Sequence, residues 1–175
     1  MILYLNGTSS SGKSSIAHEI QKQLNKPIFY FSIDTLLYAL NSHILETIQG
    51  KGSDTTEINW NSIFTGYFEC VRVLDESGNL IIADCPVYLE GLFQMYENSL
   101  KLIKEKYVVG LDCPLEVLKQ REIDRKDRAL GIAEKQFDGI HKFLKYDCIV
   151  NTANCGPYEI AEMIINNIKW PSNKF

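Results

Sequence analysis

A short segment rich in glycine and serine near the N-terminus constrains this sequence more than any other feature. It reads Gly-Thr-Ser-Ser-Ser-Gly-Lys-Ser from Gly7 to Ser14 and matches the pattern G-x-x-x-x-G-K-[ST]. Residues 2–5 before it form an apolar run that predicts a buried strand, and residues 14–24 after it predict a helix with one apolar stripe. A chain of this length contains the pattern by chance in under about 1% of cases.

The amino-acid composition of the loop is suited to binding an anion. Gly7 and Gly12 allow the backbone to curl so that successive N–H groups face one point, and the following helix adds the positive end of its dipole. In this pattern Lys13 reaches the β- and γ-phosphates of a nucleotide, and the Ser14 hydroxyl binds Mg²⁺. We therefore predict a nucleotide site with ATP and Mg²⁺ as cofactors. Its residues are Gly7, Thr8, Ser9, Ser10, Ser11, Gly12, Lys13, Ser14 and Ser15.

Strand-like and helix-like runs alternate along the rest of the chain. Strands are predicted at residues 2–5, 28–33, 80–83, 107–111 and 146–150. Helices are predicted at residues 14–24, 35–47, 60–77 and 89–105 and from Pro114 and Pro157 onward, with a loop at 49–57. This alternation predicts βαβ units and a parallel sheet with helices on both faces. The 175 residues, without repeat or linker, fit one domain over 1–175.

The composition excludes several other classes of protein. The 18 basic and 22 acidic residues give a net charge of -4, which provides no general attraction to nucleic acid or anionic membrane. The five cysteines are odd in number and form no Cys-x-x-Cys pair, which argues against a disulfide framework or a zinc knuckle. The N-terminal apolar run is too short for a signal peptide or a membrane span, so we expect a cytoplasmic protein. The oligomeric state stays open.

Three aspartates directly follow predicted strands, at the edge where open α/β sheets place their sites. They are Asp34, Asp84 and Asp112. An apolar strand followed by Asp is typical of the carboxylate that helps to hold Mg²⁺, so Asp84 is a metal candidate beside Ser14. Each aspartate has the alternative role of a helix cap or turn carboxylate. That alternative fits Asp34, where a helix begins, and it explains Asp112, which Pro114 follows.

Three arginines form a second constellation. Arg121, Arg125 and Arg128 are spaced i, i+4 and i+7, so a continuous helix places them on one face. With Gly131 they predict a lid near 121–135 that closes over a triphosphate. The alternative is a solvated face paired with neighbouring acids. We favour the lid because the chain has a phosphate loop elsewhere.

Aromatic residues are the candidates for lining an acceptor pocket. Most are expected in the core, and a few are expected to contact a partly apolar acceptor molecule. The candidates are Trp60, Phe64, Tyr67, Tyr88 and Phe93. The three histidines do not group with cysteines or acids at metal-ligand spacing.

Several of these segments together resemble the chloramphenicol phosphotransferase-like family. The run Asp-Arg-x-x-Gly-x-Ala-x-x-Gln at 127–136 carries the resemblance more specifically than the phosphate loop, which many families share. The similar segments are 5–15, 31–36, 109–113 and 121–136, with His141, Tyr146 and Asp147. In one departure, Cys85 stands where the family tends to have a second acid after Asp84.

The resemblance implies a three-layer P-loop kinase-like fold, with a five-stranded parallel sheet flanked by helices. It also implies transfer of the γ-phosphate of ATP to an alcohol group of a small molecule. In that family Asp34 corresponds to the proposed general base, and Arg125 and Arg128 to lid arginines. The sequence therefore predicts a small-molecule O-phosphotransferase with the catalytic residues Lys13, Asp34, Arg125 and Arg128. Two alternatives stay open: a nucleoside or nucleotide kinase, and a nucleotide-binding regulatory protein with weak ATPase activity.

Overall fold

A five-stranded parallel sheet forms the centre of the computed structural model, which describes residues 1–50, 58–125 and 129–171. Neighbouring strands are parallel in all four pairs, and the order is β2-β3-β1-β4-β5. The predicted five-stranded parallel sheet is confirmed. The strands are β1 (Ile2–Gly7), β2 (Phe29–Ser32), β3 (Ile81–Asp84), β4 (Lys106–Asp112) and β5 (Cys148–Asn151).

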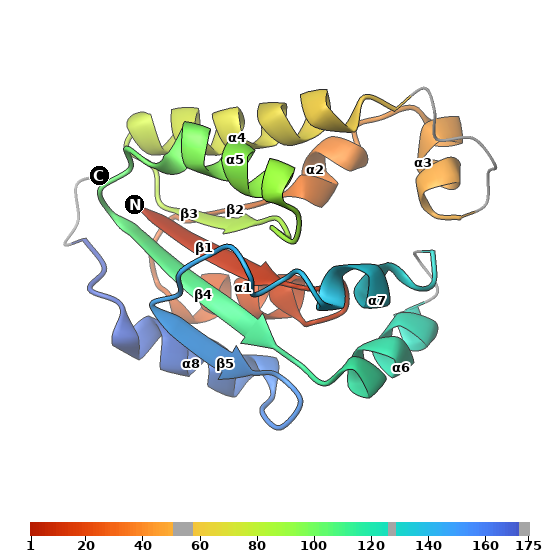
Figure 1. The fold of residues 1–175 in the computed structure, drawn as a ribbon. Helices are drawn as coiled ribbons and strands as arrows, with labels where there is room; N and C mark the ends of the chain where they lie inside the picture. The colour runs from red at the N-terminus through yellow and green to blue at the C-terminus, as the bar shows by residue number, and fades with distance from the viewer. Residues whose placement is uncertain (51–57, 126–128, 172–175) are drawn as a thin grey trace.

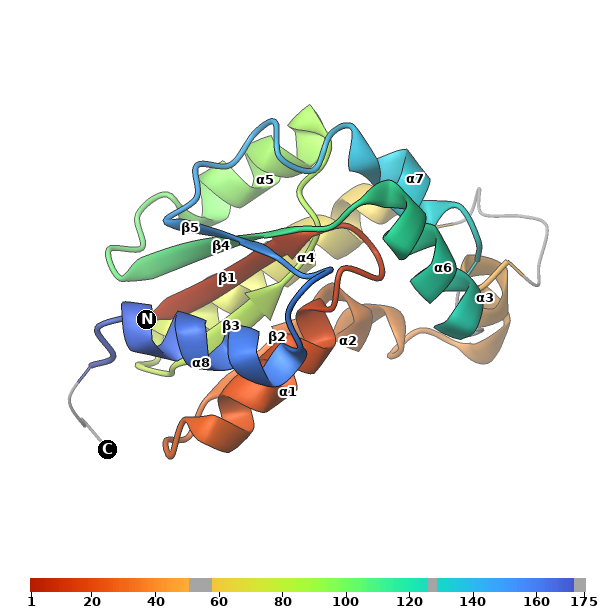
Figure 2. The same cartoon turned by 90° about the horizontal axis from the view of Figure 1, so that it is seen from below.

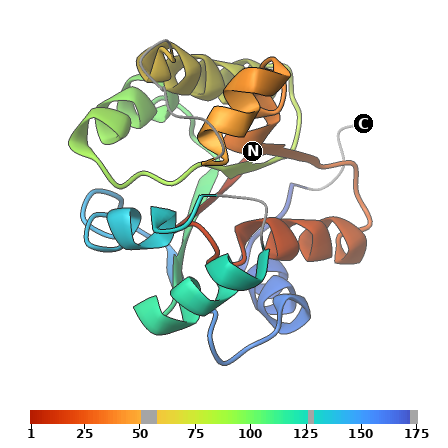
Figure 3. The same ribbon diagram turned by 90° about the vertical axis from the view of Figure 1, so that its right-hand side faces the viewer.

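Helices cover both faces of the sheet and give the three layers that were predicted (Figure 1). One face carries α4 (Trp60–Glu76) and α5 (Glu90–Leu100). The other carries α1 (Lys13–Gln23) and α8 (Pro157–Asn167), which lie side by side in Figure 2. Around the carboxyl ends of the strands, seen in Figure 3, lie α2 (Ile33–Leu37), α3 (Ser42–Ile48), α6 (Leu115–Arg125) and α7 (Ile132–Phe137).

The alternation of side chains along β1 divides the core in two. Ile2 and Tyr4 face α4 and α5, where they pack with Tyr67 and other buried residues. Leu3 and Leu5 face α1 and α8. Since successive side chains of a strand point to opposite faces, a run that is apolar at every position is what a sheet covered on both faces requires.

Apart from shifts of one or two residues at element ends, three helical segments differ from the prediction. The single helix predicted over 35–47 is wrong, because the chain leaves α2 after Leu37 and α3 begins anew after Asn41, whose backbone is extended. The helix predicted over 89–105 ends at Leu100, and α7 was not predicted. Of the predicted loop at 49–57, residues 51–57 lie outside the described residues. In the described part of the chain, no helix has the length and apolar character of a membrane span.

Candidate active site

The phosphate loop connects β1 directly to α1, as predicted, and its two glycines have different physical roles. Gly12 adopts a left-handed conformation with φ of 94° at the N-cap of α1, which favours glycine. Gly7 is confined by its neighbours. A Cβ there would lie 2.6 Å from the Ser11 Oγ and 3.0 Å from the Leu111 carbonyl oxygen. The loop therefore needs both glycines of the motif to reach this shape.

The serines of the loop carry polar groups that the described part of the chain does not satisfy. The hydroxyls of Ser9, Ser10 and Ser11 are buried without a hydrogen-bond partner there. Buried polar atoms are nearly always paired, so three such hydroxyls on one loop fit a polar ligand. A triphosphate fits, because its oxygens accept hydrogen bonds from hydroxyls and from backbone N–H groups.

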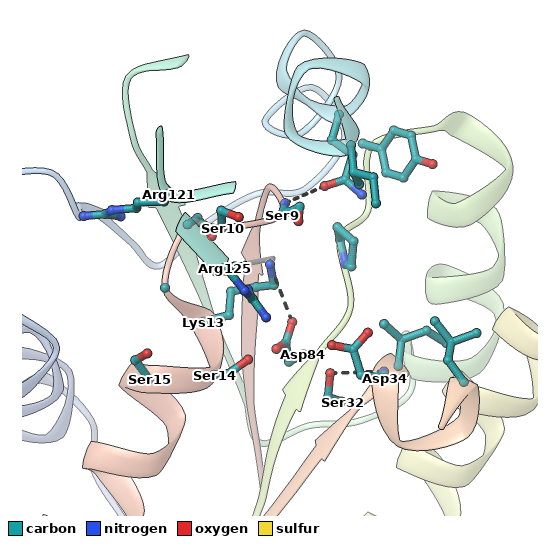
Figure 4. A pocket seen from close by; sticks show the side chains of 18 of the residues that line it. Ser9, Ser10, Lys13, Ser14, Ser15, Ser32, Asp34, Asp84, Arg121 and Arg125 are labelled. Carbon is teal, nitrogen blue, oxygen red and sulfur yellow. Dashed lines mark hydrogen bonds and ion pairs between the residues drawn. The ribbon is translucent and has the colours of Figure 1, made fainter. Parts of the chain in front are cut away.

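Lys13 and Asp84 lie together on the floor of the site (Figure 4). The Lys13 Nζ donates to the carbonyl oxygens of Gly7 and Thr8, at 2.9 and 2.7 Å, and lies 3.8 Å from the Asp84 Oδ1. Only 10% of the Lys13 side chain and 4% of the Asp84 side chain are exposed. This buried pair places one cation and one carboxylate beside the loop, where the motif and the end of β3 led us to expect them.

Asp34 lies in the first turn of α2 and points toward the same cavity as Asp84 (Figure 4). The alternative role of Asp34 as a helix cap is wrong, because Ser32 is the N-cap and its Oγ accepts the Asp34 N–H at 3.3 Å. Asp34 is one of the residues that line the cavity. Asp112 does not line that cavity, and α6 begins only at Leu115; the Asp112 Oδ1 lies 3.8 Å from the His141 Nε2.

Cys85 lies outside the cavity. It is fully buried in the core beneath α4 and α5, and its carbonyl oxygen accepts a hydrogen bond from the Tyr4 hydroxyl. Burial raises the pKa of the Cys85 thiol, and the nearby Asp84 carboxylate raises it further. Cys85 thus belongs to the core and not to the lining of the cavity.

Two of the three arginines assigned to the predicted lid lie within the described residues. Arg121 and Arg125 both line the cavity, as their i, i+4 spacing predicts. Arg121 is also fixed to the turn after β5, since its Nη2 donates to the Thr152 carbonyl oxygen at 2.7 Å. Arg125 ends α6 with an exposed side chain. Arg128 lies outside the described residues.

Two buried residues connect the lid segment to the rest of the site. The Glu122 carboxylate accepts hydrogen bonds from the backbone N–H groups of Gly131 and Ala133, at 2.7 and 3.0 Å, and so holds the start of α7 against α6. The Gln136 Oε1 accepts the Ser9 N–H at 2.6 Å, which fastens α7 to the phosphate loop. Sequence reasoning assigned no role to either residue, although both fall within the segment that resembles the family.

One cavity of about 1130 Å³ brings together Lys13, Asp34, Asp84, Arg121, Arg125 and Gln136. Its polar part is lined by the phosphate loop, both aspartates and the arginines of α6. It continues as an apolar part beneath α2, α3, α4 and α5, and the described residues there include no Lys, Arg or His. Of the five candidate aromatics, Trp60, Phe64 and Tyr88 line this part, whereas Tyr67 and Phe93 pack in the core. The apolar part is lined by Ile33, Leu37, Tyr38, Leu45, Ile48, Trp60, Phe64, Tyr88, Leu89, Leu92 and Met95.

Comparison with known sequences supports the family resemblance. Residues 1–169 match the family model described as chloramphenicol phosphotransferase-like protein. The adenylyl-sulfate kinase of Clostridium acetobutylicum is 30% identical over 146 residues, which cover 79% of this chain and 66% of that protein. The match therefore spans slightly less than two thirds of that relative.

Comparison with solved structures shows that this chain has the fold of P-loop kinases. A sugar kinase from Janibacter sp. HTCC2649 matches with a TM-score of 0.70 at 18% identity, covering 94% of this chain and 92% of that one. The APS kinase of Mycobacterium tuberculosis, in complex with AMPPNP and APS, gives a TM-score of 0.66 at 17% identity, with coverages of 94% and 95%. The Deinococcus radiodurans tunicamycin resistance protein gives 0.63 at 18% identity, with coverages of 94% and 93%.

Proposed function

This chain belongs to the chloramphenicol phosphotransferase-like family, and on that premise we propose that it is an ATP- and Mg²⁺-dependent kinase of a small, uncharged, partly apolar alcohol. One observation carries the proposal. A single cavity contains the phosphate loop with three unpaired hydroxyls, two strand-end aspartates and an apolar extension. The polar part suits the triphosphate of ATP, and the apolar part suits the acceptor.

The loop and its lysine bind the phosphates in this proposal. The backbone N–H groups and the serine hydroxyls of the loop donate to phosphate oxygens, and Lys13 holds the β- and γ-phosphates. Ser14 and Asp84 would hold Mg²⁺, and the bound ion would neutralise part of the triphosphate charge. They fit this ion, which prefers oxygen ligands and usually takes only one or two protein carboxylates beside phosphates and water. No group of three or more His, Cys, Asp or Glu suited to a metal occurs among the described residues.

Asp34 is the proposed general base. It lines the cavity together with the phosphate loop and with Ile33 and Leu37 of its own helix, so an acceptor hydroxyl and the γ-phosphate would meet beside it. There its carboxylate accepts the proton of the hydroxyl, or orients the hydroxyl for in-line attack. Arg125, and Arg128 by family resemblance, would neutralise charge on the transferring phosphoryl group.

The lining of the apolar part distinguishes between acceptor classes. An anionic acceptor such as a nucleotide or adenylyl sulfate needs cations to offset the loss of water around its charge. The described residues of this part supply none. The aromatic rings of Trp60, Phe64 and Tyr88 suit an apolar or aromatic group, and this also makes an uncharged nucleoside the second candidate.

Mass spectrometry of an acceptor panel tests the proposal. The protein is incubated with MgATP and with uncharged alcohols including chloramphenicol, nucleosides, nucleotides and adenylyl sulfate. We expect one phosphoryl group to be gained by an uncharged alcohol, and no gain with the Lys13→Ala variant. Phosphorylation of an anionic acceptor would contradict the acceptor class. Tight MgATP binding without any phosphorylated product would favour the regulatory alternative.

A further inference from the structure

Tyr30 contacts the proposed metal site from behind. It lies on β2, its hydroxyl donates a hydrogen bond to the Asp84 Oδ2 at 2.8 Å, and it does not line the cavity. The other oxygen of the carboxylate, Oδ1, is the one nearest the Lys13 Nζ. The two oxygens of Asp84 therefore face different partners.

The strand register explains why Tyr30 reaches this carboxylate. Tyr30 pairs with Ile82 and Ser32 pairs with Asp84, so Tyr30 lies two residues before the position opposite Asp84 and shares its face of the sheet. That face is covered by α1. The ring of His18 on this helix packs edge-on against the Tyr30 ring, with 5.1 Å between the ring centroids. The ring is thereby held between the sheet and the helix that begins at the phosphate loop.

The Tyr30 hydroxyl is a neutral donor under all ordinary conditions. Burial raises its pKa, and the Asp84 charge raises the pKa further, while an interaction with the Ser14 hydroxyl opposes the rise. The phenol therefore remains the donor in its hydrogen bond to the Asp84 carboxylate.

We propose that Tyr30 is a positioning residue for Mg²⁺, which holds the Asp84 carboxylate in the orientation that the cation requires. This inference rests on the proposed function. Partners that orient a metal-binding carboxylate commonly affect metal affinity about 10-fold or more, even without touching the metal. A tyrosine that merely filled the core would affect folding stability and leave the metal dependence of nucleotide binding unchanged.

Calorimetry of the Tyr30→Phe variant tests the proposal, because the substitution keeps the ring against His18 and removes only the hydroxyl. Binding of AMPPNP is measured with and without Mg²⁺, and Mn²⁺ affinity in the AMPPNP complex is measured by electron paramagnetic resonance. We expect metal-free AMPPNP binding to stay within about twofold, and Mn²⁺ affinity to fall about 10-fold. Tyr107→Phe, which changes another partly buried tyrosine packed against the same core, is the matched control and should behave like the wild type.

A double-mutant cycle with Asp84→Asn tests whether Tyr30 affects Mn²⁺ affinity through the Asp84 carboxylate. If Tyr30 acts through Asp84, adding Tyr30→Phe to Asp84→Asn should change Mn²⁺ affinity no further. Wild-type Mn²⁺ affinity in Tyr30→Phe would overturn the inference, as would an equal loss of AMPPNP binding with and without Mg²⁺. A wild-type protein that binds no MgAMPPNP would instead contradict the proposed function. Thermal melting of each variant confirms that the comparison is made on folded protein.

Discussion

Replacing Asp34 by asparagine tests the proposed chemistry most directly, because the change removes the base and leaves its surroundings intact. The Ser32 Oγ accepts the backbone N–H of Asp34, so the cap of α2 does not depend on the side chain. Loss of the carboxylate removes the stabilisation of an acid near a helix N-terminus, about 0.5 kcal/mol, and asparagine keeps the size and shape of the side chain. The variant should therefore fold normally.

The Asp34→Asn substitution should lower the turnover number. A positioned general base contributes roughly 10²–10⁴-fold, which is about 3–5 kcal/mol of the activation barrier. Among the described residues lining the cavity, the other carboxylates are Asp84 and Asp124. Asp84 is engaged by Tyr30 and Lys13, and Asp124 comes from α6, beside the proposed nucleotide. Neither is placed to substitute for Asp34, so the loss should not be rescued.

The assay compares kcat for the accepted alcohol with the dissociation constant of AMPPNP. We expect kcat to fall by at least about 100-fold in Asp34→Asn, while nucleotide affinity stays within about threefold. Asp138→Asn is the matched control, because it removes the same charge from an exposed residue outside the cavity. An Asp34→Asn enzyme that keeps kcat within about threefold of the wild type would refute the assignment of the base.

Three further substitutions test the framework of the site. Gly7→Ala introduces a Cβ 3.0 Å from the Leu111 carbonyl oxygen, so we expect about 1–3 kcal/mol of destabilisation by denaturant titration and weaker nucleotide binding. Glu122→Gln loses one of the two oxygens that accept backbone N–H groups, and it should lower the free energy of unfolding by about 2 kcal/mol in the same titration. An unchanged denaturation midpoint would contradict the role of Glu122 as an anchor. Burial lowers the pKa of His141, although the nearby Asp112 opposes this shift. Neutral His141 therefore contributes stability above about pH 6.5, and this stability is lost as the pH falls through the pKa of the folded state. Melting temperatures of His141→Gln should therefore decline less between pH 7 and pH 5 than those of the wild type.

The sequence predicts the sheet and one edge of the site because those features are local. Apolar runs such as Leu3–Leu5 define strands buried on both faces, and parallel strands bring their carboxyl ends to one edge. The motif at Gly7–Ser14 and the strand-end position of Asp84 then determine which groups meet there. Each of these inferences needs only the neighbours of a residue in the chain.

Contacts between distant segments were beyond this reasoning. The Tyr30 hydroxyl reaches Asp84 across 54 positions, and the Gln136 amide oxygen reaches the Ser9 N–H across 127. No local pattern distinguishes a tyrosine that orients a carboxylate from one that fills a core. The break between α2 and α3 was also missed. The helical sequence pattern continues through Tyr38, although the backbone becomes extended at Asn41.

The distribution of charge in the cavity bears on specificity. The polar part is lined by three cations and three carboxylates, Lys13, Arg121, Arg125, Asp34, Asp84 and Asp124, whereas the described lining of the apolar part has no basic residue. Contacts with apolar walls discriminate weakly, at about 1–3 kcal/mol for each methylene group. Under the proposed function, recognition of the acceptor then depends on the position of one hydroxyl beside Asp34. The kinase should thus tolerate varied apolar groups on its acceptor and reject molecules whose hydroxyl lies elsewhere.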